Sequence, residues 1–155
     1  MRSRVGLNSW LFSGTLAAAL LWPCLACATL GEPESSIAAE PQLGRASIKA
    51  TDQGAYRVHE SQLPSGTVVR EYAAPNGNVF AVTWRGPFVP NLKQLLGRYF
   101  EEYAAGAKAN HADHHHVEMR QSDLVVQASG HMRATVGRAY LPQALPAGVT
   151  LGDLQ

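Results

Sequence analysis

Residues 67–85 read TVVREYAAPNGNVFAVTWR, and this stretch decides the fold. Two runs rich in β-branched and aromatic residues, Thr67–Tyr72 and Val79–Arg85, flank the turn sequence Pro75-Asn76-Gly77-Asn78. Asn-Gly between two such runs is a strong hairpin signal, because a tight turn needs backbone conformations that these two residues adopt readily. The stretch therefore predicts two antiparallel strands joined by a short turn.

A further strand is expected before this hairpin. Tyr56–Leu63 has strand composition and leads into Pro64-Ser65-Gly66, where a residue of fixed φ precedes a permissive one. These segments together predict a three-stranded antiparallel meander. Alternation along Val79–Arg85 places the apolar side chains of Phe80, Val82 and Trp84 on one face. Val68 and Tyr72 have the spacing to share that face.

A helix is predicted after the meander. Asn91 can cap its first turn, and Gln94 can return the hydrogen bond of a capping box. Apolar residues then recur at helical spacing and form one broad stripe: Leu92, Leu95, Leu96, Tyr99, Phe100 and Tyr103. Gly106 lies where the C-terminal end of the helix is expected. Gly97 lies in the middle of the helix, where glycine costs about 1 kcal/mol relative to alanine, and either a close approach to the sheet or a surface position would explain it. We expect the helix to cover the Phe80–Val82–Trp84 face.

Strand character returns at Val117–Arg120, Leu124–Ser129 and His131–Tyr140, with Gly130 as the expected turn or bulge residue. The fold class that follows is α+β. It consists of a curved antiparallel sheet with a three-stranded meander, one amphipathic helix, and then two to three further strands.

Changes in composition predict the domain limits. Residues 29–53 are rich in Ala, Ser, Glu, Gly and Pro and are expected to form a partly flexible lead-in that packs loosely. Within it, Glu34–Glu40 has room for a turn or two of helix before Pro41 stops it. Residues 54–140 are expected to form a single α+β domain. Residues 141–155 are expected to form an extended tail whose aliphatic residues cover a sheet edge.

The N-terminus has the three parts of a secretory signal peptide. Arg2 and Arg4 precede the uncharged, mostly apolar residues 7–25, and Ala26-Cys27-Ala28 provides a small-residue cleavage pattern. The apolar part is short for a membrane span, which needs about 20 apolar residues. Cleavage near Ala28 predicts a soluble periplasmic or secreted protein without cysteine, because both cysteines precede that site.

Lipidation is an alternative for the same segment. Leu25-Ala26-Cys27 partly resembles a bacterial lipoprotein box, in which Cys27 becomes the lipid-anchored first residue. That box prefers an aliphatic residue where this chain has Cys24, so cleavage near Ala28 is the favoured interpretation. An uncleaved membrane anchor is the remaining alternative.

The charge balance excludes one class of partner. The chain has 13 basic and 12 acidic residues and no basic stripe along any predicted element. Nucleic acid would require such a stripe, so nucleic-acid binding is not expected.

Several runs in a fixed order carry a resemblance to a known family. They are Leu63–Tyr72, Val79–Trp84 continuing to Phe88, Leu95-Leu96-Gly97 with Tyr99-Phe100, Ser122–Val126, Gly130-His131-Met132 and Gly137–Tyr140. In these runs the sequence resembles the bacterial family catalogued as domain of unknown function 2844. The resemblance implies an exported envelope protein and supplies no activity, ligand or catalytic residue. The histidine run at His111–His116 stands apart from the family's pattern.

That histidine run is the sharpest local feature of the chain. The run contains four histidines, His111, His114, His115 and His116. Their imidazoles suit zinc, copper or nickel, and the carboxylates of Asp113 and Glu118 lie beside them. Helical spacing would put His111 and His115 on one face, whereas an extended chain would align His114 and His116. Because all of them lie in one loop, a solvated loop without metal is the favoured interpretation, and weak metal binding is the alternative.

A second set would be a Ser–His–Asp arrangement of a hydrolase. His131 and Asp123 would act with Ser122 or Ser129, but no G-x-S-x-G elbow accompanies them. No Gly-rich phosphate loop, C-x-x-C or H-E-x-x-H motif is present either. We therefore predict no catalytic residue, and a hydrogen-bonded structural histidine is the favoured interpretation of His131.

Other polar strand residues are expected to be structural. His59 alternates with Arg57 and Ser61 onto what should be an exposed face. Arg70 and Glu71 must point to opposite faces, so each can form an ion pair only across strands.

Three functions from different classes remain. The first is a non-enzymatic envelope module that binds a partner protein or small ligand through a sheet face or edge. The second is metal binding through the histidine run, and the third is a hydrolase that uses His131. The lack of catalytic signatures favours the first.

Overall fold

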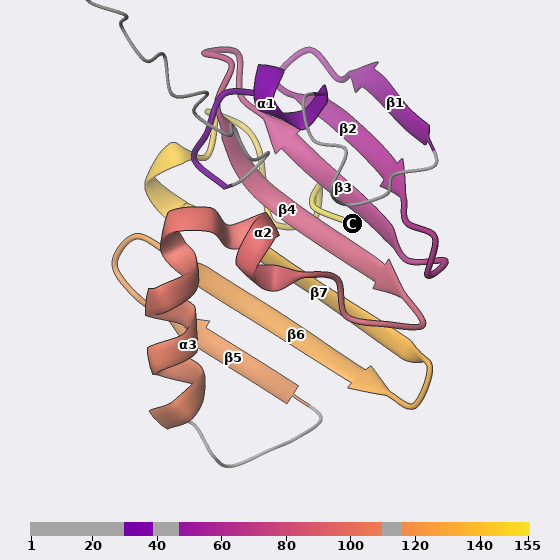
Figure 1. Ribbon diagram of the computed structural model, residues 1–155. Helices are drawn as coiled ribbons and strands as arrows, with labels where there is room; N and C mark the ends of the chain where they lie inside the picture. Colours follow the sequence, from indigo (N-terminus) through magenta and orange to yellow (C-terminus); the bar gives the residue numbers. More distant parts are fainter. Residues whose placement is uncertain (1–29, 39–46, 110–115) are drawn as a thin grey trace, which may run out of the picture.

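The computed structural model describes residues 30–38, 47–109 and 116–155. Seven strands form one antiparallel sheet in the order β1-β2-β3-β4-β7-β6-β5 (Figure 1). The strands are β1 Ser47–Asp52, β2 Arg57–Gln62, β3 Val68–Ala73, β4 Val79–Gly86, β5 His116–Arg120, β6 Val125–His131 and β7 Ala134–Tyr140. The helical segments are α1 Ser35–Ala38, α2 Leu92–Leu96, η2 Gly97–Tyr99, α3 Phe100–Ala109 and η3 Pro142–Ala144.

The connections divide the sheet into two meanders. β1 to β4 follow one another through hairpins, and the turn before β4 contains Gly77 with φ +83°, a conformation that favours glycine. The chain then crosses from β4 through α2, η2 and α3 to the far edge strand β5 (Figure 1). β5, β6 and β7 return toward the centre, where β7 pairs with β4. The β4–β7 pair is therefore where the two meanders join.

The α+β class with an antiparallel sheet agrees with the sequence, but the sheet is larger than expected. The additional strand is β1, which falls in the segment that we expected to be a flexible lead-in. β1 pairs with β2 over its whole length, from Ser47 opposite Gln62 to Asp52 opposite Arg57. Residues 48–52 are all exposed, so this edge strand has no buried apolar face and no alternating pattern to reveal it.

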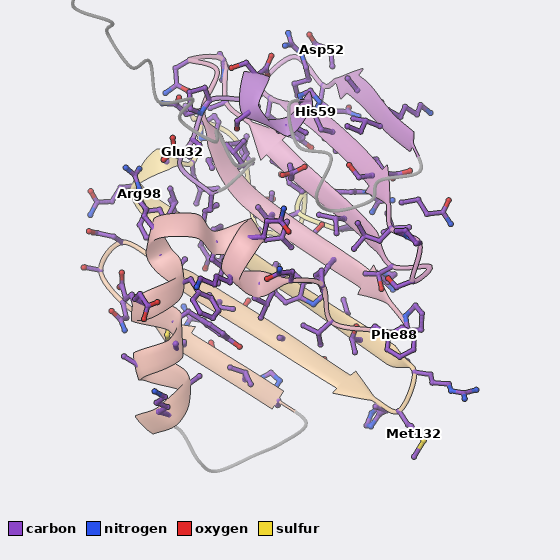
Figure 2. All side chains as sticks on the ribbon, in the orientation of Figure 1. Glu32, Asp52, His59, Phe88, Arg98 and Met132 are labelled. Atoms are coloured by element: carbon purple, nitrogen blue, oxygen red, sulfur yellow. The ribbon has the colours of Figure 1, made fainter. Side chains whose placement is uncertain are left out.

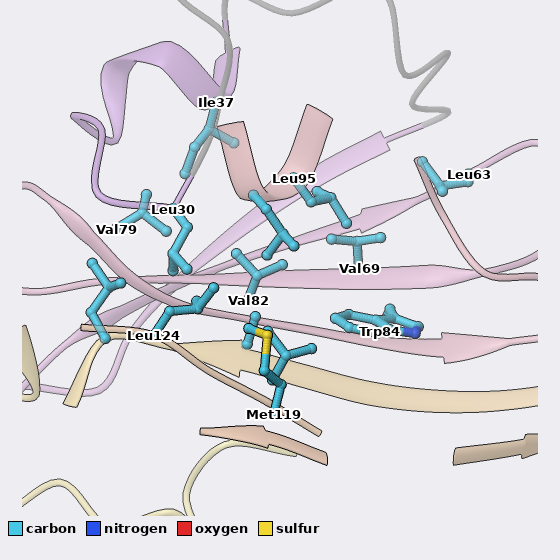
Figure 3. Packing of buried hydrophobic residues seen from close by; sticks show 14 residues of the cluster. Leu30, Ile37, Leu63, Val69, Val79, Val82, Trp84, Leu95, Met119 and Leu124 are labelled. Atoms are coloured by element: carbon cyan, nitrogen blue, oxygen red, sulfur yellow. The ribbon is translucent and has the colours of Figure 1, made fainter. Parts of the chain in front are cut away.

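The main core lies between the sheet and the helices, on what we call the helix-covered face (Figure 3). All six residues of the predicted helical stripe pack there, which confirms that prediction. Asn91 caps α2 by accepting a hydrogen bond from the main-chain N of Gln94 at 3.3 Å. Leu30 and Ile37 are fully buried in the same core. The first described residues are therefore part of the packed domain.

The expected face of Phe80 is wrong, because β4 contains a bulge. Tyr72 pairs with Ala81, whereas Ala73 pairs with Val79, so Phe80 is an extra residue on β4. Val82 and Trp84 point toward the helices, as predicted. Phe80 packs on the opposite face with Tyr72, and the centroids of the two rings are 6.2 Å apart.

The structure defines the roles of three glycines for which we had expectations from the sequence. Gly97 ends α2 with φ +50° and produces the break between α2 and η2. Gly106 lies inside α3, not at its end, and it packs closely against β5: a Cβ there would stand 2.3 Å from Sδ of Met119. Gly130 pairs with Thr135 within the β6–β7 ladder, so the turn falls after it, and Arg133 there has φ +62°.

Within the part of the chain that the structure describes, every helix is too short or too polar to cross a bilayer.

Candidate binding site on the open face of the sheet

Three rows of side chains cross the sheet on the face opposite the helices, here called the open face. The strands pair in a fixed register, so each row follows from the partners along the sheet. The inner row consists of Thr51, Val58, Tyr72, Ala81, Tyr140, Val125 and Arg120. The polar row consists of Lys49, Glu60, Arg70, Thr83, Arg138, Gln127 and Glu118. The outer row consists of Gln62, Val68, Arg85, Val136, Ser129 and His116.

The C-terminal tail covers the inner row. The tail contributes four apolar residues, Leu145, Val149, Leu151 and Leu154. They form a second core with the aromatic side chains of the inner row. Leu154 is 4 % exposed, and the chain ends over the middle of the sheet (Figure 1). The tail therefore covers a sheet face, not the sheet edge that the sequence suggested.

Side chains of the polar row bond to one another across the strands. Arg70 Nε donates to Glu60 Oε2 at 2.7 Å, which is the cross-strand pair expected for Arg70. Arg138 Nε donates to Gln127 Oε1 at 2.7 Å, and Gln127 Nε2 donates to Glu118 Oε1 at 3.0 Å. The hydrogen bonds from Gln127 and Arg120 lower the pKa of the Glu118 carboxyl. These bonds hold the long polar side chains in one arrangement along the row.

A pocket of about 520 Å³ opens between the polar row and the outer row. Its lining comes from Glu60, Val68, Arg70, Thr83, Trp84, Arg85, His116, Gln127, Ala128, Ser129, Val136, Gly137, Arg138, Leu154 and Gln155. The side chains of Trp84 and Ala128 pack toward the helices. Because side chains alternate along a strand, these residues contribute main chain to the pocket floor. A volume of this size lies within the range of ligand sites, about 300–1,000 Å³.

The pocket has an excess of positive charge. Arg70, Arg85 and Arg138 line it, and Glu60 is the carboxylate side chain in the same lining. Glu60 is paired with Arg70. Among the described residues no carboxylate lies within 4 Å of the guanidinium of Arg85 or Arg138. Both of these charges are therefore available to an anion.

The last residue of the chain enters this pocket from one side. The main-chain oxygen of Gln155 accepts hydrogen bonds from Arg70 Nη1 at 2.5 Å and Tyr72 Oη at 2.9 Å. Its main-chain N donates to the same Tyr72 hydroxyl at 3.1 Å. Thr83 Oγ1 lies 3.5 Å from the Gln155 oxygen. The polar row thus already binds the main-chain N and O of Gln155.

A turn in the tail positions that residue. Asp153 Oδ2 accepts from Thr150 N at 2.7 Å and from Thr150 Oγ1 at 2.8 Å, and these bonds lower the pKa of Asp153. Burial, together with the charge of Asp153 and the neighbouring Tyr72, raises the pKa of Tyr56. Arg138 Nη1 also donates to the Leu151 carbonyl at 2.9 Å.

The expectation that His59 and Ser61 lie on an exposed face is wrong. Their side of β2 is the helix-covered face, where Ser61 is fully buried and the His59 side chain is 13 % exposed. His59 Nε2 lies 3.6 Å from Glu34 Oε2, and Arg57 pairs with the same carboxylate. Figure 2 shows His59 beside α1. These residues anchor the first described segment to the sheet.

The histidine run is only partly described. His111, His114 and His115 lie outside the described residues. His116 begins β5 with an exposed side chain, and its Nε2 lies 4.0 Å from Glu118 Oε2 at the rim of the pocket. The residues that the structure describes contain no group of three His, Cys, Asp or Glu side chains able to hold a metal. Binding of zinc, copper or nickel by the run stays a prediction, which calorimetry on an alanine variant of the four histidines would test.

The structure does not bring together the residues of the hydrolase hypothesis. His131 is the last residue of β6, and Asp123 precedes the first residue of the same strand. At about 3.3 Å per residue, the seven residues of β6 hold them roughly 20 Å apart. Both residues are exposed. They do not form one site.

The sequence did not reveal most of the pocket residues. Arg70 was singled out, but only as a partner in an ion pair, and Thr83, Gln127 and Arg138 were not singled out. Each appeared as an ordinary polar residue on the exposed side of a strand. They form one row only because β7 pairs with β4, which brings Thr83 opposite Arg138, 55 residues later in the chain.

The fold and the pocket define a small α+β protein that presents cationic side chains on one face of an antiparallel sheet. The chain belongs to the family described as protein of unknown function DUF2844, whose sequence profile matches residues 26–154. The match confirms the resemblance seen in the sequence and includes β1 and the tail. No curated protein and no solved structure matches the chain.

Proposed function

We propose that this chain is an exported, non-enzymatic binding module of a bacterial envelope, and that the open-face pocket holds an anionic ligand. Export is supported by the charged start, apolar stretch and Ala26-Cys27-Ala28 pattern of the N-terminus. The resemblance to a bacterial family of exported proteins supports the same location. Binding is supported by the geometry and charge of the pocket.

The observation that carries this proposal is the pair of arginines without acidic partners. Arg85 and Arg138 line one pocket, and the Arg138 side chain is held in place by Gln127 and the Leu151 carbonyl. Hydrogen bonds between guanidinium and carboxylate, sulfonate or phosphate are charge-assisted and roughly twice as strong as neutral ones. A positioned guanidinium also loses less side-chain entropy when it binds. The pocket therefore favours an anion over a neutral molecule.

The outer row adds an apolar wall. Val68 and Val136 line the pocket beside the arginines, and Val136 is 40 % exposed. A ligand with an anionic group on Arg138 and an apolar part on these valines would use both features. Such a combination of apolar walls with a few positioned polar groups is typical of ligand sites.

The test is a titration with 8-anilinonaphthalene-1-sulfonate, a probe with one sulfonate and an apolar ring system, followed by its fluorescence. We expect saturable binding that weakens about tenfold in Arg138→Gln and in Arg85→Gln, as is typical when one partner of a charged hydrogen bond is removed. The matched control is Arg98→Gln, since Arg98 lies on the helical side of the molecule (Figure 2). Equal affinity in all four proteins would overturn the proposal.

A further inference from the structure

We infer that the ligand of the open-face pocket is an extended acidic peptide segment of a partner protein, which lies along the polar row. The inference rests on the proposed function, because it names the ligand class of the same site. Three observations carry it: how the site holds Gln155, the length of the groove, and its charge.

The polar row holds Gln155 through both its main-chain N–H and its main-chain oxygen. The Tyr72 hydroxyl donates to the Gln155 carbonyl at 2.9 Å and accepts from the Gln155 N at 3.1 Å. Arg70 adds a second donor to that carbonyl at 2.5 Å. Arg138 donates to another tail carbonyl, that of Leu151, at 2.9 Å. Two arginines of the row therefore already bind main-chain carbonyl groups.

The pocket is one half of a longer groove. A second hollow of about 380 Å³ lies on the other side of Gln155, over β1 to β3. Glu60, Arg70 and Gln155 line both hollows, so Gln155 is the divider between them. The first hollow alone extends from Glu60 on β2 to His116 on β5, across six strands. At about 4.8 Å between strands this is roughly 24 Å, the length of about seven extended residues.

Charge selects an acidic segment. Beyond Gln155 the groove continues past Arg138 and Arg85, which have no carboxylate within 4 Å among the described residues. The tail itself combines an acidic residue with leucines in Leu151-Gly152-Asp153-Leu154-Gln155. An acidic partner segment would make the same kind of main-chain contacts and would in addition complement the charge of the arginines.

The probe is a synthetic peptide of residues 149–155 of this chain followed by three glutamates, compared with the same peptide followed by three glutamines. Both compete with 8-anilinonaphthalene-1-sulfonate for the full chain, up to about 1 mM peptide because the tethered tail competes at a high effective concentration. We expect the glutamate peptide to displace the probe at least about tenfold more effectively than the glutamine peptide. Arg138→Gln should abolish that difference, and Arg98→Gln should leave it unchanged.

The other outcomes separate this inference from the proposed function. If inorganic phosphate displaces the probe but neither peptide does, the peptide inference is wrong and the anionic pocket stands. Equal displacement by the two peptides would also overturn it, since charge would then select nothing. A probe affinity that is unchanged in Arg85→Gln and in Arg138→Gln would overturn both the peptide inference and the proposed function.

Discussion

The indole ring of Trp84 occupies the space that a side chain of Gly137 would take. The two residues are partners in the β4–β7 pair, and a Cβ atom on Gly137 would stand 2.2 Å from Cζ2 of the indole. Trp84 is 2 % exposed and lies in the main core (Figure 3). The contact therefore lies where the two meanders join. On the other face of the same strands, it is adjacent to Thr83 and Arg138 of the polar row.

Gly137→Ala should therefore destabilise the protein. The added methyl group meets the buried ring of Trp84, and overpacking of this kind costs about 1–3 kcal/mol. Urea unfolding followed by circular dichroism measures the change. The control is Gly152→Ala, whose nearest neighbour would be Thr150 Oγ1 at 3.5 Å, and it should stay within about 0.5 kcal/mol of the natural chain. Equal stability of Gly137→Ala and the control would contradict the packing described.

Tyr72→Phe should loosen the end of the tail. The substitution keeps the aromatic packing with Phe80 but removes the hydroxyl that contacts both main-chain groups of Gln155. A net loss of about 1 kcal/mol is expected, with faster hydrogen exchange at the Gln155 amide. Tyr140→Phe in the same row is the matched control, because no hydrogen bond joins the Tyr140 hydroxyl to another described residue. Unchanged exchange in Tyr72→Phe would show that these bonds do not hold the tail.

The turn at Asp153 should respond to acid. Hydrogen bonds from the main-chain N and the hydroxyl of Thr150 lower the pKa of Asp153 below 3.8, its ordinary value. Because the folded pKa lies below that of the unfolded chain, the turn is fully stabilised above pH 3.8 and loses this stabilisation as the pH falls through the folded pKa. An NMR titration of the Thr150 amide should show a midpoint below 3.8 that is absent in Asp153→Asn. A midpoint above 3.8 would contradict the hydrogen-bonded turn.

Export predicts a definite mass for the protein made in a bacterial cell. Cleavage near Ala28 removes both cysteines, and Trp84 is then the single tryptophan. Intact mass spectrometry of the extracytoplasmic fraction should find a chain that starts near Thr29 and carries no free thiol. A lipid adduct on Cys27 would favour the lipoprotein alternative, and a cytosolic chain that still carries Met1 would contradict export.

Local sequence patterns were enough for most strands and for the helix. The Asn76-Gly77 turn, the Asn91 cap and the apolar stripe from Leu92 to Tyr103 are all signals within a few residues of the elements they define. β1 was missed because its residues are exposed at a sheet edge. The predicted face of Phe80 was wrong because one bulge on β4 shifts the alternation by one residue.

Local sequence patterns did not predict the candidate site. Arg70, Thr83 and Arg138 become neighbours through strand register and through the return of β7 to β4. The tail carbonyl of Gln155 joins them from a part of the chain that was expected at a sheet edge. Both relationships are set by tertiary structure, so residue spacing in the sequence does not reveal them.

The open face, between the polar and outer rows, is the ligand site that we propose. Chemical-shift mapping on the ¹⁵N-labelled chain with 8-anilinonaphthalene-1-sulfonate tests it most directly. We expect the amide signals of Thr83, Gln127 and Arg138 to move with saturation while those of α3 stay in place. Movement confined to α3 and the helix-covered face, with the polar row unchanged, would contradict it.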